Sequence, residues 1–426
     1  MIKLNKKYLS WLWLLPIAVP FLVALALVIK YGVNTPFMDE WELVRLFHKL
    51  YEGGLSINDF WIQHNEHRIF FVSITTVVLG YITHWNLIAQ MLVSLSLVLA
   101  MLVVFCVYCK KDMKIGPQYA IYLTLISVLI FSAGQWENWV RGFQMQWFFC
   151  TFSGVFALYL LDKRATLSRY NARYILAIFF CIVSSYSLGS GIFFWPACLV
   201  PLIATKQSFR RIAAWCCVGA ATFTFYFYNY IFFKRAPTGA HAVHYAQFFF
   251  AYLGNALAHD PEVAVIFGMV LSGLACFAVY YALIVKRIAL DKIALPIGLI
   301  IFVVMSAMIT AQSRTNVTGA FGATTSKYAT VSTLLIVALV LLYMQIMKTK
   351  SLAPPILLAV IILPIIAGIS LYGIREMRQM KLTLTAVKTC LSQSQPTEQC
   401  LGSAHPSAEK VKIELRFLKE KHLAGY

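Results

Sequence analysis

Charge is scarce in this chain of 426 residues. Asp, Glu, Lys and Arg together make up only 12% of the sequence, roughly half of their share in a soluble globular domain. Apolar runs stand in their place, and many approach the ~20 residues that a helix needs to cross a bilayer. We therefore predict an all-α integral membrane protein, with the lipid bilayer as its main partner.

The sequence also lacks the parts of a nucleotide-binding protein. None of the loops that we assign to the cytoplasm contains the P-loop pattern GxxxxGK[ST], and the stretch SLGSG at residues 187–191 does not follow a strand, as a dinucleotide fingerprint would. No loop has the size of a soluble domain, and no internal repeat is evident. Any chemistry is therefore expected on the outer face, where nucleotides are absent.

Acidic residues are fewer than basic ones, at 17 against 36, which gives a net charge of +19. The basic residues concentrate in the N-terminus and in short clusters, such as KKDMK at residues 110–114 and KQSFRR at 206–211, while the alternate segments hold few. This asymmetry follows the positive-inside rule for cytoplasmic loops. The excess charge thus indicates membrane topology, and nucleic acid is not an expected partner.

The same rule predicts about eleven spans, with the N-terminus in the cytoplasm and the C-terminus outside. Their predicted cores are Trp11–Ile29, Leu87–Tyr108, Gln118–Phe131, Trp147–Leu161, Tyr174–Leu188, Phe193–Ala204, Ile212–Phe232, Val263–Val285, Leu295–Ile309, Val331–Met347 and Leu352–Tyr372. The apolar run Ile69–Ile82 is short, and counting it as a span would place KKDMK outside. We expect it to lie at the outer leaflet or to enter it partly.

Three regions follow from this topology. Residues 1–373 form the transmembrane domain, in which residues 31–86 are a first outer loop with juxtamembrane helices, and residues 374–426 form a small outer tail. Eight of the ten cysteines lie in or at apolar spans, where cysteine behaves as a small hydrophobe. The other two, Cys390 and Cys400, lie in the tail, and we expect a disulfide between them if the tail is outside. Residues 407–422 predict a short amphipathic helix capped by Ser407.

The first outer loop begins with NTPFMDEWE, which places Asp39, Glu40 and Glu42 beside the membrane. The residues after Asp39 have helical spacing, and the helix is expected to end at Gly53. One interpretation is that Asp39 only caps this helix and Glu40 favours its dipole. The other is that these two carboxylates belong to a functional site, and Glu42 to a solvated face.

The loop continues with HNEHRI, which contains His64, Glu66, His67 and Arg68. A metal site would need a third ligand from elsewhere, such as Asp39 or Glu137, and HxxH alone is a weak signal. Arg68 suits a membrane interface, where its head reaches the lipid headgroups. Together these side chains also suit a site for phosphate and for an acceptor.

Two later outer loops carry polar groups that packing does not require. QWENWVRGFQMQW at residues 135–147 contains Glu137, Arg141 and Gln144 among tryptophans, which suits carbohydrate, although Glu137 and Arg141 also have the spacing of an ion pair. The other loop is AQSRTNVTGAFGATTSKYAT at residues 311–330. Arg314, Lys327 and Tyr328 there indicate an anion clamp.

Sugar transfer from a polyprenyl-phosphate carrier fits this pattern. The phosphate departs as a stable anion, so one carboxylate suffices to remove the proton of the acceptor hydroxyl. Cations at the membrane surface stabilise the charge that the phosphate gains. A lipid donor also explains a site at the membrane without a nucleotide fold.

The acidic pair after the first span, the histidine-containing segment and the short apolar helix resemble the GT-C superfamily of polytopic glycosyltransferases, without the prolines of its His-Pro-Pro-Leu stretch. In size and tail the chain looks most like the phage-encoded, serotype-converting O-antigen glucosyltransferases. The resemblance implies a GT-C-like bundle in a bacterial inner membrane. The implied reaction is inverting transfer of a hexose, with glucose as the expected sugar, from undecaprenyl phosphate to the O-antigen of lipopolysaccharide on the periplasmic face.

The same resemblance implies roles for individual residues. Asp39 would be the general base, and Glu40 would orient it or the acceptor. The phosphate candidates are Arg68, Arg314, Lys327, Tyr328, His64 and His67. The acceptor candidates are Glu66, Glu137, Arg141 and Gln144. No particular cofactor is indicated, and the use of a divalent metal stays open.

Two other functions compete with this one. An O-antigen polymerase would also act on polyprenyl-linked sugars, but it usually carries a large basic outer loop between later spans, whereas the richest loop here is the first and is acidic. A lipid-linked sugar flippase or transporter predicts charged residues inside spans and paired broken helices. The predicted spans here are nearly free of charge.

Overall fold

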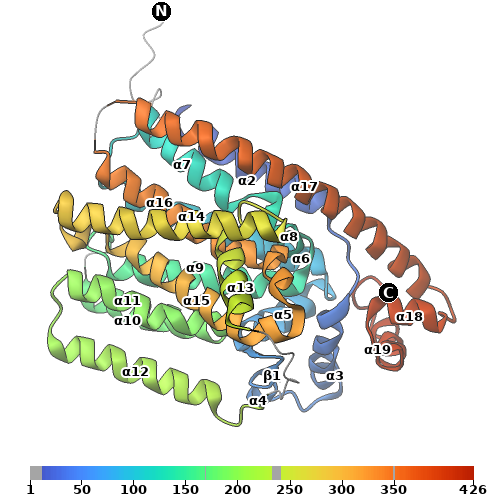
Figure 1. Ribbon diagram of the computed structural model, residues 1–426. Helices are drawn as coiled ribbons and strands as arrows, with labels where there is room; N and C mark the ends of the chain where they lie inside the picture. Colours follow the sequence, from blue (N-terminus) through green and yellow to red (C-terminus); the bar gives the residue numbers. More distant parts are fainter. Residues whose placement is uncertain (1–11, 168, 233–240, 349–350) are drawn as a thin grey trace, which may run out of the picture.

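The computed structural model describes residues 12–167, 169–232, 241–348 and 351–426, and these parts are almost entirely helical (Figure 1). Each predicted core coincides over most of its length with one helix; residue 11 lies outside the described residues, and the core Ile212–Phe232 extends beyond the end of its helix. These helices are α2 (Leu15–Tyr31), α6 (Leu87–Lys110), α7 (Pro117–Ile130), α9 (Met145–Leu161), α10 (Tyr170–Ser185), α11 (Phe194–Ala204), α12 (Phe209–Phe227), α14 (Pro261–Tyr280), α15 (Ala294–Thr318), α16 (Ala329–Ile346) and α17 (Ala353–Leu391).

Length and composition show which helical stretches suit a membrane. Within the described residues, seven are long and apolar enough to cross one. They are Leu87–Lys110, Pro117–Val140, Gly142–Leu161, Pro261–Val285, Ala294–Thr318, Ser326–Ile346 and Ala353–Leu391. The helices α2 and α10 and the stretch Gly189–Ala204 around α11 are apolar but shorter. The chain is thus an all-α, multi-pass membrane protein, and eleven remains the predicted number of spans.

The segments between and after these helices hold shorter elements. They contain η1 (Met38–Leu43), α3 (Val44–Glu52), α4 (Ile57–Phe60), α5 (Phe70–Thr83), η2 (Ala133–Gln135), α8 (Trp136–Val140), η3 (Gly142–Gln144), η4 (Gly189–Phe193), α13 (Ala242–Gly254), a π-helical turn η5 (Tyr281–Val285), η6 (Leu290–Lys292), η7 (Ala320–Thr324), η8 (Ser326–Tyr328), α18 (Glu398–Ala404) and α19 (Ala408–Glu420). The strands described are β1 (Gln63–His64) and β2 (His67–Arg68), which pair antiparallel. The helix α13 was not predicted from the sequence.

Hydrogen bonds join one group of loops at one end of the bundle. Arg164, after α9, donates from Nε to Asp112 Oδ2 at 2.8 Å and from Nη2 to the carbonyl of Lys292 at 2.9 Å. Gln345, at the end of α16, donates to the same Asp112 oxygen at 2.7 Å. We call this the basic end, because it gathers the clusters of basic residues.

The other group of loops meets at the opposite end, which we call the site end. The amide of Asn138 donates to the carbonyl of Lys327 at 2.9 Å, and the ammonium of Lys388 donates to the carbonyl of Asn34 at 3.0 Å. The loops that the charge pattern separates therefore also separate in space.

Both ends of α5 lie at the site end. At its start, the Phe71 amide donates to the Tyr186 carbonyl at 3.4 Å, and just after it the His84 carbonyl accepts from the Ala424 amide at 2.9 Å. Fourteen helical residues extend only ~21 Å, which is less than the ~30 Å of a bilayer core. This placement agrees with the prediction that Ile69–Ile82 does not pass through the bundle.

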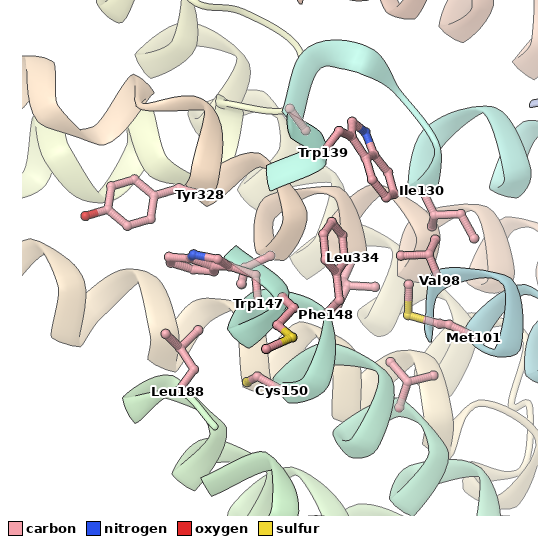
Figure 2. Packing of buried hydrophobic residues seen from close by; sticks show 14 of the residues in the cluster. Val98, Met101, Ile130, Trp139, Trp147, Phe148, Cys150, Leu188, Tyr328 and Leu334 are labelled. Atoms are coloured by element: carbon pink, nitrogen blue, oxygen red, sulfur yellow. The ribbon is translucent and has the colours of Figure 1, made fainter. Parts of the chain in front are cut away.

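The interior of the bundle is packed by aromatic and aliphatic side chains (Figure 2). The ring of Trp139 stacks on Phe148 with centroids 4.7 Å apart, and Phe194 of α11 stacks on Phe302 of α15 at 3.8 Å. A Cβ at Gly154 of α9 would lie 2.0 Å from the ring of Phe194. The glycine therefore allows α9 and α11 to approach closely, as small residues do between membrane helices.

The C-terminal tail extends the last long helix. The 39 residues of α17 span about 58 Å, so the domain boundary expected at residues 373–374 lies inside one continuous helix. A disulfide joins Cys390 to Cys400. The Ser407 hydroxyl accepts from the Lys410 amide at 3.4 Å, which confirms the predicted cap of α19.

The tail then folds back, so that α18 and α19 lie beside α3 (Figure 1). His48 Nε2 is 2.8 Å from Glu414 Oε2, and its ring stacks on Phe417 with centroids 3.7 Å apart. Glu42 forms ion pairs with Lys410 and His405. The tail therefore contacts Glu42, whose side chain stays 37% exposed, which agrees in part with the solvated face predicted for it.

Candidate functional site

The segment that carries Asp39 leaves α2 and turns into η1. Met38 has φ +52°, a left-handed conformation that is uncommon for a residue with a side chain. Such backbone conformations persist only where surrounding contacts impose them. Here the contacts come from Glu40, whose carboxylate accepts from the Phe37 amide at 2.8 Å and from the Phe143 amide at 3.1 Å.

The Glu40 carboxylate thus accepts hydrogen bonds from the backbone of the site. Glu40 is only 2% exposed, and burial raises the pKa of its carboxyl while nearby Arg141 and the two amide donors lower it. The hypothesis that Asp39 caps the helix is wrong, because the carboxylate that bonds to the N-cap amide belongs to Glu40. Glu40 therefore holds the backbone next to Asp39, and its role in orienting Asp39 or the acceptor stays a prediction.

Asp39 remains open to solvent, with a side chain that is 47% exposed. Its Oδ2 lies 3.9 Å from Nε2 of His64. The neighbouring His64 ring lowers the pKa of Asp39, desolvation opposes that shift, and the positive charges of Arg141 and Lys327 support it. The carboxylate is therefore ionised at neutral pH and able to accept a proton.

His64 and His67 face each other across a β-hairpin rather than along a helix. They pair in register, and Asn65 takes φ +48° in the turn between them, a conformation that asparagine tolerates. His67 accepts from the Gly189 amide at 3.3 Å. Burial, with Arg314 nearby, lowers its pKa to about 3, so the ring is neutral and is not a cation for phosphate.

Arg68 has a structural role, because its guanidinium bonds to backbone carbonyls of the fold. Its guanidinium is 3% exposed and donates to the carbonyls of Trp61 and Tyr226, each at 2.6 Å, and to the carbonyl of Tyr228. These bonds tie the hairpin to the end of α12. We therefore remove Arg68 from the phosphate candidates.

Glu66 and Arg314 form an ion pair at the end of α15. Glu66 was predicted to contact the acceptor and Arg314 to contact phosphate, and the structure brings them together although they are 248 residues apart in the chain. Their side chains are 21% and 27% exposed. The pair is thus reachable from solvent, and Arg314 is already neutralised by a partner.

The loop after α7 supplies a connected set of polar groups. Glu137 Oε1 accepts hydrogen bonds from Arg141 Nη1 at 3.5 Å and from Gln144 Nε2 at 3.2 Å. Gln144 in turn accepts from Trp147 Nε1 at 2.9 Å, and Arg141 donates from Nη2 to the Phe37 carbonyl at 2.8 Å. The predicted ion pair exists, and its arginine also links this loop to the Asp39 segment.

Lys327 and Tyr328 lie in η8, which Asn138 anchors through the Lys327 carbonyl. The ring of Tyr328 is buried between Trp147 and Tyr252, with centroids 5.6 Å and 5.1 Å away. No ion pair involves the half-buried ammonium of Lys327 within the described part of the chain. Because its charge acts on Asp39, Lys327 is the cation best placed to meet an anion beside that carboxylate.

A metal site was left open by the sequence. Among the residues in 12–167, 169–232, 241–348 and 351–426, no group of three or more His, Cys, Asp or Glu side chains is arranged to hold a metal ion. His64 and Asp39 are neighbours, but no third such residue joins them to complete a group.

The site therefore gathers His64, Arg141 and Lys327 around the exposed carboxylate of Asp39. The anchors Phe143 and Asn138 were missed, because a backbone amide or a buried amide side chain has no signal in a single sequence. No protein-family model, curated protein or solved structure matches this chain.

Proposed function

We propose that the protein is a glycosyltransferase of the bacterial inner membrane that uses a polyprenyl-phosphate sugar as donor. It moves a hexose, most simply glucose, from undecaprenyl phosphate to a sugar of the O-antigen of lipopolysaccharide on the periplasmic face. The surroundings of Asp39 carry this proposal: an ionised, half-exposed carboxylate lies 3.9 Å from His64 and near the ammonium of Lys327, which forms no ion pair with any described residue.

The reaction needs these groups in the following roles. Asp39 removes the proton of the acceptor hydroxyl as its oxygen attacks the anomeric carbon from the face opposite the phosphate. A new C–O bond forms, the bond from the anomeric carbon to the phosphate oxygen breaks, and its electron pair leaves with the phosphate. The ammonium of Lys327 stabilises the negative charge that the departing phosphate gains. Arg314 is a second phosphate ligand after exchange of its partner Glu66.

The sidedness of the chain supports a lipid donor. The site end gathers the carboxylates and the aromatic loops, and the basic end gathers the clusters of Lys and Arg. By the positive-inside rule, the basic end faces the cytoplasm and the site end faces the periplasm. A donor held in the outer leaflet reaches such a site laterally, with its phosphate at the membrane surface.

The test compares Asp39→Asn with the control Glu262→Gln. Glu262 is an exposed carboxylate at the start of α14. Protein in nanodiscs is given undecaprenyl-phosphate glucose and an O-antigen polysaccharide, and transferred glucose is measured. Loss of the general base should lower the rate by about 10²- to 10⁴-fold, while Glu262→Gln keeps the wild-type rate.

Two outcomes would overturn the proposal. Wild-type transfer by Asp39→Asn would show that Asp39 is not the base. The second is a lack of transfer by the wild type with every polysaccharide tried, together with translocation of the donor lipid across vesicles. That result would identify a flippase instead.

A further inference from the structure

A cavity lies at the site end, beside the Asp39 site but outside it. It has a volume of about 300 Å³ and is open to solvent. Four separate segments line it: α8, the loop before α14, the turns η7 and η8, and α17. A volume near 300 Å³ is at the lower end of the range for ligand sites, so the cavity has room for a small unit of a larger ligand.

Its lining combines aromatic rings with hydrogen-bonding groups. Trp136, Phe321 and Tyr372 contribute the rings, and Glu137, His259 and Ser326 contribute polar atoms. Among the described residues that line it, none is Lys or Arg. An anionic group such as a phosphate would therefore meet a carboxylate without a balancing cation. Aromatic faces with hydroxyl and carboxylate groups instead suit a neutral polyhydroxylated ring.

His259 provides a specific acceptor in this lining. Its ring packs on Tyr372 with centroids 4.1 Å apart, and burial lowers its pKa to about 4, so it is neutral. The nearby backbone of Ile369 opposes this lowering of the pKa without reversing it. The buried Nε2 has no hydrogen-bond partner within the described residues. Such an atom is costly to leave unpaired, and a ligand hydroxyl would satisfy it.

The cavity connects to the Asp39 site through shared residues. Glu137 lines the cavity, and its carboxylate also receives Arg141, which donates to the Phe37 carbonyl two residues before Asp39. Ser326 lines it as well and directly precedes Lys327. A ligand held in the cavity would thus lie next to the reacting groups without taking their place.

We propose that this cavity binds a neutral, non-reacting sugar unit of the acceptor polysaccharide, so that a neighbouring hydroxyl of the same chain reaches Asp39. The aromatic rings receive the apolar faces of the sugar, and His259 and Glu137 accept its hydroxyl protons. This inference rests on the proposed transferase function. It adds a subsite that selects and positions the acceptor.

The first experiment measures transfer kinetics of the variants Tyr372→Ala, Tyr372→Phe and His259→Ala in nanodiscs. The control is Leu371→Ala, an exposed neighbour on the same helix that does not line the cavity. Loss of the ring or of the acceptor nitrogen should raise the KM for the polysaccharide by about tenfold. The KM for undecaprenyl-phosphate glucose should stay within twofold. Tyr372→Phe keeps the ring and should stay close to the wild type, which separates lost stacking from misfolding.

The second experiment measures binding without catalysis. Asp39→Asn protein is titrated with O-polysaccharide that mild acid has released from enterobacterial lipopolysaccharide. The same titration is repeated with a double variant that carries both Asp39→Asn and Tyr372→Ala. Weaker binding only in the double variant supports the cavity even if wild-type transfer is never observed. Unchanged acceptor KM and binding in the Tyr372 and His259 variants would overturn the subsite while leaving the proposed function intact. A rise in the donor KM instead would also overturn it.

Discussion

Glu40 offers a sharp test of how the site is built. Its carboxylate is the acceptor for two amides that come from different parts of the chain, Phe37 beside Asp39 and Phe143 in η3. Replacing Glu40 with Ala removes both acceptors from a position that is 2% exposed. Water cannot easily replace them there. The change should therefore loosen the Asp39 segment from the loop that carries Arg141.

The magnitude follows from those two bonds. A buried donor left without a partner costs about 1–3 kcal/mol, so Glu40→Ala should lower the stability by roughly 2–6 kcal/mol. Glu40→Gln keeps one acceptor oxygen, and its loss should be about half of this. The matched control is Glu262→Ala at the same end of the bundle, which should change stability by less than about 0.5 kcal/mol.

The assay is thermal unfolding of the purified protein in one detergent, with folded protein counted by size-exclusion chromatography, alongside transfer activity. A pH series adds an independent readout. Burial raises the pKa of Glu40. The pH-dependent part of its contribution to the folding stability is therefore fully present below the pKa of the unfolded state and is lost as pH rises through the pKa of the folded state. The wild type should thus lose stability over that rise relative to Glu40→Gln. Equal melting of Glu40→Ala and Glu262→Ala would refute the reasoning.

Three further predictions concern residues with other roles. Arg68→Met should destabilise the fold by about 3–6 kcal/mol, since three carbonyls lose a charged donor; a donor KM that rises without any loss of stability would instead restore its phosphate role. Cys390→Ser opens a disulfide that spans 10 residues and should cost about 3 kcal/mol, seen as faster proteolysis of the tail, whereas thiol labelling of both Cys390 and Cys400 in unreduced wild type would contradict the bond. Because the pKa of Asp39 lies below the ordinary value of an aspartate, which is about 3.9, activity should persist as pH falls to that value and decline below it. His64→Ala should move this acid limb upward, and an unmoved limb would remove His64 as its cause.

Several elements could be predicted because their signals are local. A long apolar run predicts a membrane helix without knowledge of its neighbours, since every backbone group is satisfied within the helix. Ser407 as a cap and Gly53 as a helix end follow from conformations that depend on adjacent residues. The short length of Ile69–Ile82 predicted a helix that does not cross.

Other elements could not be predicted because their partners are distant. The helix α13 is too short for a span and packs against α14 and α15, so its stability depends on helices that follow it. The tail was expected to be accessory, yet it reaches α3 through His48 and Phe417. Complementary surfaces of this kind have no periodicity to detect.

The candidate site divides along the same line. The sequence by itself determined the membrane class and the segregation of basic loops, because composition and charge placement are properties of the chain. The role of Asp39 as base rests on the resemblance and stays a prediction. Only the tertiary structure decided that Glu40 holds the backbone, that Arg68 is consumed by carbonyls, and that Lys327 is unpaired among the described residues near Asp39. The physical reason is that a polar group becomes structural or available according to which distant donors and acceptors reach it, and folding alone brings those together.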